Sequence, residues 1–419
     1  MEIKRIFASG INPELCSRCK GRGYCGKQCP IFDKIKDFLP KSKTHFSGSS
    51  PPEIFVGRQG YPEINTGILS PQGYGETEEM SMPEVWYEKN LSIKDILSHR
   101  GKLIYSRFKS KIQDPRYENN SRNKFLTTMQ EISMADKSVS TEFFLKKPIR
   151  KGFEVDKQNP IIWNPAPLKA IRLEENPHVQ KKVDYLVSDI HVKAAVAMKE
   201  LYKNKIQTSN IIKILSAGLL GIKKNRKLVP TRWSITATDD TLSKFLLEKI
   251  RFYPEISEIL LFHGDYVGNH YEFLLLPDTF SFEVIEAYMS GSVWNQTREI
   301  SISQDYELFS GRRSYASNVT GAYYTARLAL AEYLEKIKKQ ASCFVMREER
   351  PEYNAPLGVG ILRELGRDAF SKKPETFSTI QEALNKSQTR LKLPIKTFTE
   401  KSWLLKERGK QKRITQFFN

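Results

Sequence analysis

The stretch that decides the fold class is residues 256–276, which read ISEILLFHGDYVGNHYEFLLL. Two apolar runs, 256–263 and 270–276, are rich in Ile, Leu, Phe and Tyr and have the length of strands. The residues between them, 264–269, include two glycines and an asparagine, which favour a turn. This segment therefore predicts two neighbouring strands. Cys343, in the apolar run 341–345, is likewise a candidate for a buried position in another strand.

Helical patterns lie on both sides of this strand pair. Apolar side chains recur at helical spacing in the segments 121–136, 178–203, 209–222, 320–339 and 376–387. Another helix is expected to begin near Ser92, where Ser92 and Asp95 have the spacing of a capping box. Strands are predicted at 53–56 and 140–146, and residues 148–167 are interpreted as a long connection. Because helices and strands are interleaved, the sequence predicts an α/β or α+β fold.

A basic connection, 223–227, leads into Arg232-Trp233-Ser234-Ile235-Thr236, which alternates polar and apolar residues as a strand does. Asp239 and Asp240 follow, and acidic residues suit the positive end of a helix dipole, so they are expected to open the next helix. Binding of Mg²⁺ by this pair is the alternative interpretation.

The chain has 419 residues, of which 39% are hydrophobic and 27% are charged, as expected for a protein with two or three folded domains. We predict a four-cysteine metal knuckle over 1–40, two larger domains over 41–220 and 221–395, and a flexible tail over 396–419. No apolar run reaches the roughly 18 residues that a membrane helix needs, and no secretory segment opens the chain. We expect a soluble, cytoplasmic protein associated with the nucleoid.

Basic residues are in clear excess: Lys and Arg number 67 against 48 Asp and Glu, a net charge of +19. Residues 1–50 carry ten basic and four acidic residues, and residues 390–419 carry nine and two. A positive surface favours polyanions, because each neutralised phosphate releases counterions. DNA is therefore an expected partner, with solvated basic ends as the alternative.

Four of the five cysteines, Cys16, Cys19, Cys25 and Cys29, fall within fourteen residues, at the spacing C-x2-C-x5-C-x3-C. Thiols this close in a non-secreted chain favour metal ligation over disulfides. Structural Zn²⁺ is the preferred ion, since four thiolates complete its tetrahedral shell, and an iron–sulfur cluster is the alternative. Residues 21–27 also read G-x4-G-K, but Gln28 stands where a phosphate-binding loop has Ser or Thr.

The chain ends in Gln411-Lys412-Arg413-Ile414-Thr415-Gln416-Phe417-Phe418-Asn419. The pattern Q-x-x-I-x-x-F-F is that of peptides that dock on PCNA, the replication sliding clamp. One tight helical turn places Ile414, Phe417 and Phe418 on one side as an apolar plug, while Gln411 forms hydrogen bonds beside it. Exposed aromatic pairs are costly unless a partner covers them. PCNA is therefore a predicted partner, and a tail that folds back on its own domain is the alternative.

Three central segments are weaker candidates for a site. His263, Asp265, His270 and Glu272 could serve a metal or acid–base chemistry, but their spacing fits no familiar ligand set, which favours two strand histidines. Arg312, Arg313 and Ser314 precede the 320–339 helix, where basic and hydroxyl groups favour a phosphate site; a capped loop is the alternative. Arg232 is a further candidate for contact with nucleic acid.

Together these segments resemble the archaeal Nre family of DNA repair proteins along nearly the whole chain. The resemblance is carried by the four-cysteine segment and the terminal peptide, and by internal segments: 57–62 with 65–67, 232–237 with 239–240, and 311–324 with 326–327. It implies a role in the response to DNA damage, a C4-type zinc finger and recruitment to PCNA. It implies no defined catalytic activity.

Three functions remain open on the sequence alone. The leading interpretation is a DNA repair factor recruited to PCNA by its tail. The second is an enzyme acting on nucleic acid or a nucleotide, with a site near Arg232, Asp239, His263 and Arg312. The third is a nucleic-acid-binding module without chemistry, whose binding would be strong and salt-dependent.

Overall fold

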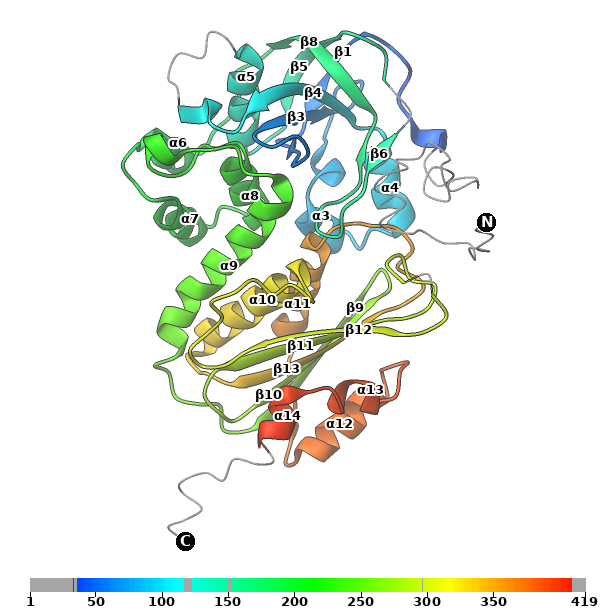
Figure 1. The fold of residues 1–419 in the computed structure, drawn as a ribbon, viewed down its shortest axis with the longest axis vertical. Coiled ribbons are helices and arrows are strands. Elements are labelled where there is room, and N and C mark those ends of the chain that lie inside the picture. The colour runs from blue at the N-terminus through cyan, green and yellow to red at the C-terminus, as the bar shows by residue number, and fades with distance from the viewer. Residues whose placement is uncertain (1–32, 34–35, 117–122, 150–151, 296, 409–419) are drawn as a thin grey trace, which may run out of the picture. The chain divides into compact units, whose positions relative to one another are not determined.

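A computed structural model describes residues 33, 36–116, 123–149, 152–295 and 297–408 (Figure 1). The chain divides into two units. The amino-terminal unit holds the described residues up to Leu242 and the segment Ala355–Ile361, and the carboxy-terminal unit holds Ser243–Asn354 and the described residues from Leu362 onward. Helices and sheets are mixed in both units, so the predicted fold class is confirmed.

The amino-terminal unit is built on a six-stranded sheet in the order β1-β5-β8-β4-β3-β2. Neighbouring strands are antiparallel except β4 and β8, which are parallel. A separate two-stranded sheet pairs β6 with β7. The strand bounds are β1 His45–Ser50, β2 Ile54–Val56, β3 Glu63–Ser70, β4 Ile104–Lys111, β5 Val139–Leu145, β6 Phe153–Glu154, β7 Ile162–Trp163 and β8 Pro165–Leu173.

Helices complete this unit, and their bounds are α3 Pro83–Glu88, α4 Ile93–Gly101, α5 Lys124–Met134, α6 Lys181–Ser188, α7 Ala194–Lys203, α8 Thr208–Ser216 and the first part of α9 Thr231–Ile250. The predicted capping box is confirmed, because the Ser92 side chain accepts the Asp95 N–H and the Asp95 side chain accepts the Ser92 N–H. A buried cluster of Phe55, Leu69 and Tyr105, with Leu103 and Ile162, forms apolar contacts beneath the end of β2.

The strand predicted at 232–236 is wrong, since these residues form the start of helix α9. Asp239 and Asp240 consequently lie near the middle of the helix rather than at its first turn, so the capping interpretation of this pair is wrong as well. Within the described residues, no group of three or more His, Cys, Asp or Glu side chains is arranged to hold a metal ion, which gives the Mg²⁺ alternative no support.

The single helix predicted over 178–203 is also wrong, because α6 ends at Ser188 and α7 begins at Ala194. Asp189 breaks the helix: its Oδ1 accepts the N–H groups of His191 and Val192 at 2.8 and 3.1 Å. The buried Arg226 then donates to the carbonyl of Asp189 at 3.0 Å and holds the break in place.

The carboxy-terminal unit contains a second six-stranded sheet, in the order β12-β11-β13-β10-β9-β14. Neighbouring strands in this sheet are antiparallel except β11 and β13, which are parallel. The predicted strand pair is confirmed as β9 and β10, although its connection is reduced to Val267 and Gly268. The strand bounds are β9 Ile259–Tyr266, β10 Asn269–Leu276, β11 Ser281–Tyr288, β12 Ser301–Glu307, β13 Ser342–Glu349 and β14 Glu375–Phe377.

Helices cover both faces of this sheet, α10 and α11 on one side and α12 to α14 on the other (Figure 1). Strand β10 is therefore buried along its whole length. Its Phe273 ring lies 4.7 Å from the Phe370 ring of α11, whereas the next residue, Leu274, belongs to the apolar cluster of Leu384 and Phe398 on the other face. The helix bounds are α10 Gly321–Ile337, α11 Gly360–Ser371, α12 Ile380–Gln388, α13 Lys396–Thr399 and α14 Trp403–Arg408.

Several further predictions are confirmed here. Helices α10 and α12 occupy the segments 320–339 and 376–387 in which helices were expected. Cys343 is fully buried in β13, and burial raises the pKa of its thiol well above the usual value. No helix in the described part of the chain is both long enough and apolar enough to span a lipid bilayer.

Candidate functional site

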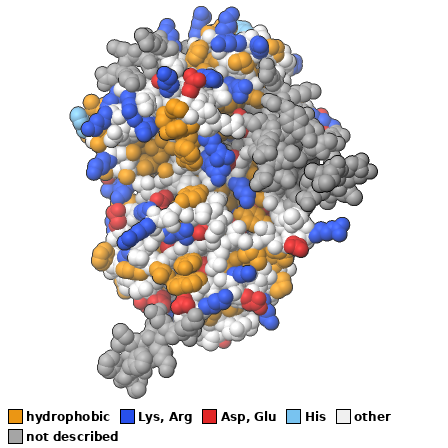
Figure 2. Space-filling model, in the orientation of Figure 1, with side chains coloured by type: hydrophobic (Ala, Val, Ile, Leu, Met, Phe, Trp, Pro, Cys, Tyr) orange, Lys and Arg blue, Asp and Glu red, His pale blue; other side chains and the backbone are white. Residues whose placement is uncertain are grey.

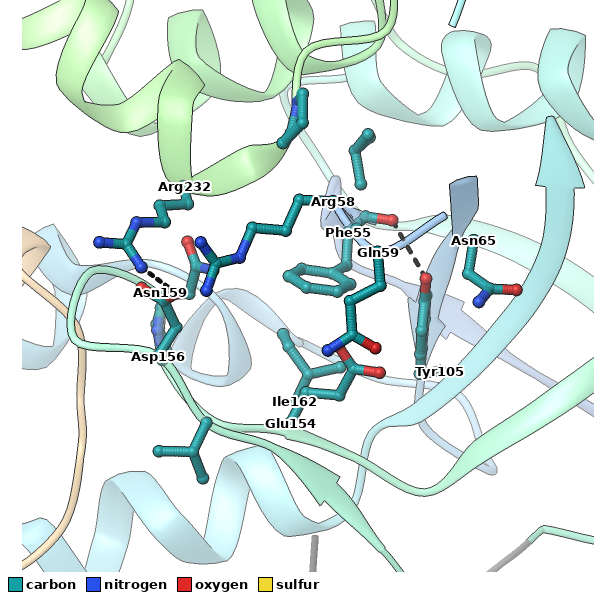
Figure 3. Close-up of a pocket in the computed structure, with 15 residues that line it drawn as sticks. Phe55, Arg58, Gln59, Asn65, Tyr105, Glu154, Asp156, Asn159, Ile162 and Arg232 are labelled. Atoms are coloured by element: carbon teal, nitrogen blue, oxygen red, sulfur yellow. Dashed lines mark hydrogen bonds and ion pairs between the residues drawn. The ribbon is translucent and has the colours of Figure 1, made fainter. Parts of the chain in front are cut away.

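A pocket of about 110 Å³ lies in the amino-terminal unit (Figure 3). Three segments form it: the end of β2 with the loop after it, the connection between β6 and β7, and the start of α9. Apolar contacts come from Phe55, Tyr105 and Ile162. Polar groups converge on this apolar floor, an arrangement typical of ligand sites. The charged and amide side chains that line the pocket are Arg58, Gln59, Asn65, Glu154, Asp156, Asn159 and Arg232.

The loop between β2 and β3 brings Arg58 and Gln59 to the pocket. Its turn depends on Gly60, which has a φ of +86° and whose carbonyl accepts the Glu63 N–H at 3.0 Å. A Cβ on Gly60 would lie 2.7 Å from the Glu63 carbonyl oxygen. Glycine adopts this conformation at no steric cost, whereas other residues are strained in it. The exposed side chain of Arg58 has no hydrogen-bond or ion-pair partner among the described residues.

The first turn of α9 brings Arg232 to the same pocket. Thr231 joins the helix to the sheet, because its Oγ1 accepts the N–H of Val56 at 2.9 Å. Pro230 stands just before the helix, and its carbonyl accepts the Ser234 N–H at 3.0 Å. Proline suits this position, since its fixed φ matches a helix and it has no N–H group to satisfy. The sequence thus places the arginine one residue inside the helix.

An ion pair fixes the direction of Arg232. Its Nη1 lies 2.9 Å from the Asp156 Oδ2, and both side chains are largely buried. The other carboxylate oxygen of Asp156 accepts the Gln158 N–H at 2.8 Å, which orients the carboxylate. Within the described part of the chain, no second partner binds the Arg232 guanidinium, so its remaining N–H groups are available to a ligand. In Figure 3 the side chains of Arg58 and Arg232 both extend toward the segment that carries Asp156 and Asn159.

The Asn159 side chain contributes an unsatisfied acceptor. The residue is only 4% exposed, and its Oδ1 accepts no hydrogen bond from any described residue. Leaving a buried polar atom unpaired costs about 1–3 kcal/mol. A donor from a bound ligand would remove this penalty, so Asn159 marks the pocket as a place for a molecule with an N–H or O–H group.

Two exposed aromatic side chains accompany the arginines. Tyr61, three residues after Arg58, is 53% exposed, and Trp233, next to Arg232, is 48% exposed. Their ring centroids lie 6.3 Å apart at an angle of 56°. Flat rings beside basic groups are the combination that proteins use to bind unpaired bases of nucleic acids.

Of the predicted phosphate contacts, only Arg232 belongs to this pocket. Arg312 lies in the carboxy-terminal unit, where its Nη1 donates to the Tyr306 carbonyl at 2.8 Å and its Nη2 lies 3.1 Å from the Asp305 carboxylate. The Arg312 guanidinium therefore stabilises the loop before α10. Arg313 and Ser314 lie in that loop as well, and phosphate binding there stays a prediction.

The histidine segment forms a buried polar cluster in β9 and β10. His270 is buried, with Nδ1 2.8 Å from Asp265 and Nε2 2.8 Å from Glu272. Burial opposes protonation of His270, but these contacts outweigh it, so the pKa of the imidazole lies above its usual value. Burial, together with the positive charge of Arg390, lowers the pKa of His263. With no metal-binding cluster among the described residues, the structure favours two strand histidines.

The remaining predicted site residues lie outside the described residues. They are the four cysteines Cys16, Cys19, Cys25 and Cys29, and the tail residues Gln411, Ile414, Phe417 and Phe418.

Sequence reasoning missed the wall of the pocket that carries Asp156 and Asn159. The segment 148–167 lacks a clear apolar period and was interpreted as a connection, but it contains β6 and β7. A usable signal was the polar run 156–159 directly before the apolar residues 161–163. Figure 2 shows more Lys and Arg than Asp and Glu side chains on the visible face, in line with the net charge of +19.

These features define the class as a two-unit protein of mixed helices and largely antiparallel sheets, with a polar pocket in its amino-terminal unit. Two family models match the chain: "Archaeal Nre, N-terminal" over residues 24–295 and "Archaeal Nre, C-terminal" over residues 307–417. The chain belongs to the archaeal Nre family, as the resemblance predicted.

Three relatives support this assignment. The chain is 36% identical over 403 residues to the DNA repair protein NreB of Archaeoglobus fulgidus, a match that covers 96% of this chain and 99% of the relative. It is 37% identical to the DNA repair protein NreA of the same organism, over 90% of this chain and 93% of the relative. It is 34% identical to the DNA repair protein NreA of Haloferax volcanii, over 85% and 87% of the two chains. No solved structure matches the chain significantly.

Proposed function

We propose that this protein is a DNA repair factor that contacts DNA and is recruited to the sliding clamp PCNA through its C-terminal peptide. The observation that carries the proposal is the similarity along 85–96% of the chain to relatives named DNA repair proteins. Because the similarity extends through both units, we assign the repair role to the chain as a whole rather than to one motif.

Recruitment to PCNA rests on the terminal pattern Q-x-x-I-x-x-F-F. Gln411 follows three residues after Arg408, the last residue of α14. That helix is anchored at its other end, where the buried Glu283 accepts the N–H groups of Trp403 and Leu404 at 2.8 and 3.3 Å. The peptide is thus joined by a short segment to a helix fixed on the carboxy-terminal unit, and basic residues 410, 412 and 413 favour an acidic rim on the clamp.

Contact with DNA is supported by charge and by the pocket. The excess of 19 positive charges favours a polyanion, and Arg58 and Arg232 present guanidinium groups to one site. The lining of that site includes neither Asp239, His263 nor Arg312, so no observation favours an enzyme built from those residues with Arg232.

The cysteine knuckle completes the proposal. Cys16, Cys19, Cys25 and Cys29 would hold one structural Zn²⁺ and fold a segment too short for its own apolar core. Elemental analysis of the purified chain should then find one zinc per molecule. Iron, with a broad absorption band near roughly 400 nm, would instead identify an iron–sulfur cluster.

The clamp interaction is tested by calorimetric titration of full-length protein into PCNA. Replacing both Phe417 and Phe418 by Ala removes two of the three apolar anchors, and burying an aromatic side chain stabilises a complex by about 1.5–3 kcal/mol. The double variant should therefore bind at least a hundredfold more weakly. The matched control is Gln416→Ala, which changes a neighbouring position that the pattern leaves open and should bind like the wild type. Undiminished binding by the double variant would falsify recruitment through the tail.

A further inference from the structure

We infer that the pocket between Arg58 and Arg232 accommodates one unpaired nucleotide of a DNA strand, while Tyr61 and Trp233 stack against adjacent bases. This inference rests on the proposed contact with DNA and specifies the form of DNA that is bound. It brings together two segments, 57–62 and 232–237, that are far apart in the sequence and meet at a single site.

The floor of the pocket is apolar. Phe55 and Tyr105 lie there with ring centroids 5.4 Å apart, nearly perpendicular to each other, and both rings are almost fully buried. Ile162 completes the apolar floor. Proteins that read an unpaired base place it against aromatic and apolar side chains and contact its edge with polar groups. A base that remains paired inside a duplex cannot enter such a pocket.

The polar groups match the edge of a base. The unsatisfied Oδ1 of Asn159 can accept a hydrogen bond from an exocyclic amine or a ring N–H. The amide side chains of Gln59 and Asn65 have no hydrogen-bond partner among the described residues and supply both donors and acceptors. Each base edge carries both donors and acceptors, so this set can pair with it, whereas the phosphodiester group of a DNA backbone offers acceptors only.

The charges favour a base inside the pocket and phosphates at its edge. Two arginines and two carboxylates, Glu154 and Asp156, line the pocket, so its interior carries little net charge. A neutral base is therefore favoured over a phosphate within it. Arg58, exposed and without an ion-pair partner in the described residues, and the free N–H groups of Arg232 are placed to neutralise the phosphates on either side.

The two exposed rings of Tyr61 and Trp233 extend the site along the bound DNA strand. Tyr61 and Trp233 are 53% and 48% exposed, with ring centroids 6.3 Å apart, and they are close in sequence to Arg58 and Arg232. Stacking on such rings tolerates any base sequence. The pocket and the ring pair thus predict preference for unpaired DNA without strong sequence specificity.

The test measures binding of the full-length chain to three fluorescent DNAs of one sequence: a single strand, a perfect duplex, and a duplex with one bulged nucleotide. We expect the single strand and the bulged duplex to bind at least tenfold more tightly than the perfect duplex, because a paired base must first be unstacked. 2-Aminopurine at the bulge should change its emission on binding, since the base is transferred into the pocket.

Single substitutions test whether DNA binds at this pocket. Trp233→Ala and Tyr61→Ala should each weaken binding of the bulged duplex by about 5- to 100-fold, and Arg58→Ala should reduce the salt dependence by about one phosphate contact. Matched controls in the same unit are Tyr185→Ala, whose side chain is 63% exposed, and Arg172→Ala, which removes a charge outside the pocket. Both controls should bind within twofold of the wild type. The three target side chains are exposed, so each variant should fold, and thermal unfolding of each variant checks this.

The outcomes separate this inference from the proposed function. Equal affinity for all three DNAs, or pocket variants that behave like the controls, would overturn the nucleotide pocket while leaving contact with DNA intact. Free deoxynucleotides that bind as tightly as the bulged duplex would overturn it too, in favour of a small-molecule site. Absence of binding to any DNA would contradict both, whereas recruitment to PCNA would still be decided by the tail variants.

Discussion

Replacing Arg327 by Met removes one partner of a fully buried ion pair in the carboxy-terminal unit. The Arg327 Nη1 lies 2.9 Å from the Glu307 Oε2, and both side chains are 1% exposed. The Arg327 Nε also donates to the Ser243 hydroxyl at 3.1 Å. Met retains most of the side-chain volume, so the main change is that the Glu307 carboxylate loses its cation.

The size of the effect follows from this burial. Removing one partner of a buried pair costs about 3–5 kcal/mol, because the other charge stays buried and unpaired. In a unit of this size each kcal/mol lowers Tm by about 2–4 °C, so a decrease of roughly 6–20 °C is expected.

Calorimetric unfolding of the wild type and the variant measures this decrease in Tm. Lys372→Met is the control, since Lys372, the residue after α11, forms a solvent-exposed ion pair with Asp368 at 2.6 Å that should contribute less than about 1 kcal/mol. Combining Arg327→Met with Glu307→Leu should recover most of the loss, because no unpaired charge remains. A loss below about 1 kcal/mol for Arg327→Met would refute the reasoning.

Three further predictions concern the site, the tail and pH. Gly60→Ala forces a Cβ to within 2.7 Å of the Glu63 carbonyl oxygen at a φ of +86°, so it should weaken binding of bulged DNA about as much as Arg58→Ala; unchanged affinity would show that the turn does not position the loop. Glu283→Ala removes the acceptor at the start of α14 and should speed hydrogen exchange over 402–408 while PCNA affinity stays within twofold; unchanged exchange would contradict this anchor. Because the folded pKa of His270 is raised, its contribution to stability is fully present below about pH 6.5 and is lost as the pH rises through the folded pKa. The difference in Tm between wild type and His270→Gln should therefore be larger at pH 6 than at pH 8, and the opposite order would be incompatible with the Asp265 and Glu272 contacts.

Local patterns predicted part of the carboxy-terminal unit: β9, β10, α10, α12 and the strand that holds Cys343. The strand pair β9–β10 and helix α10 were found because apolar runs and helical spacing are strong there, and both faces of the sheet are covered. Cys343 was placed correctly for the same reason, as its neighbours in β13 are apolar.

The amino-terminal unit was harder because its key contacts are distant in sequence. Residues 232–236 alternate like a strand, but Ser234, Ile235 and Thr236 are all buried, so the start of α9 is covered on more than one face and no helical stripe is visible. The break after α6 depends on Arg226, thirty-seven residues away from Asp189. The pocket is likewise formed by three segments that are distant in sequence, and no local sequence pattern predicts that they come together.

The measurement that tests the central claim most directly is survival after DNA damage of cells whose copy of this gene has been deleted and then replaced. Deletion should lower survival after ultraviolet or cross-linking damage. The wild-type chain and Gln416→Ala should restore survival, and the chain with both Phe417 and Phe418 changed to Ala should not, although it accumulates to the same level. Full restoration by that double variant, or normal survival without the gene, would contradict a repair factor that works on the clamp.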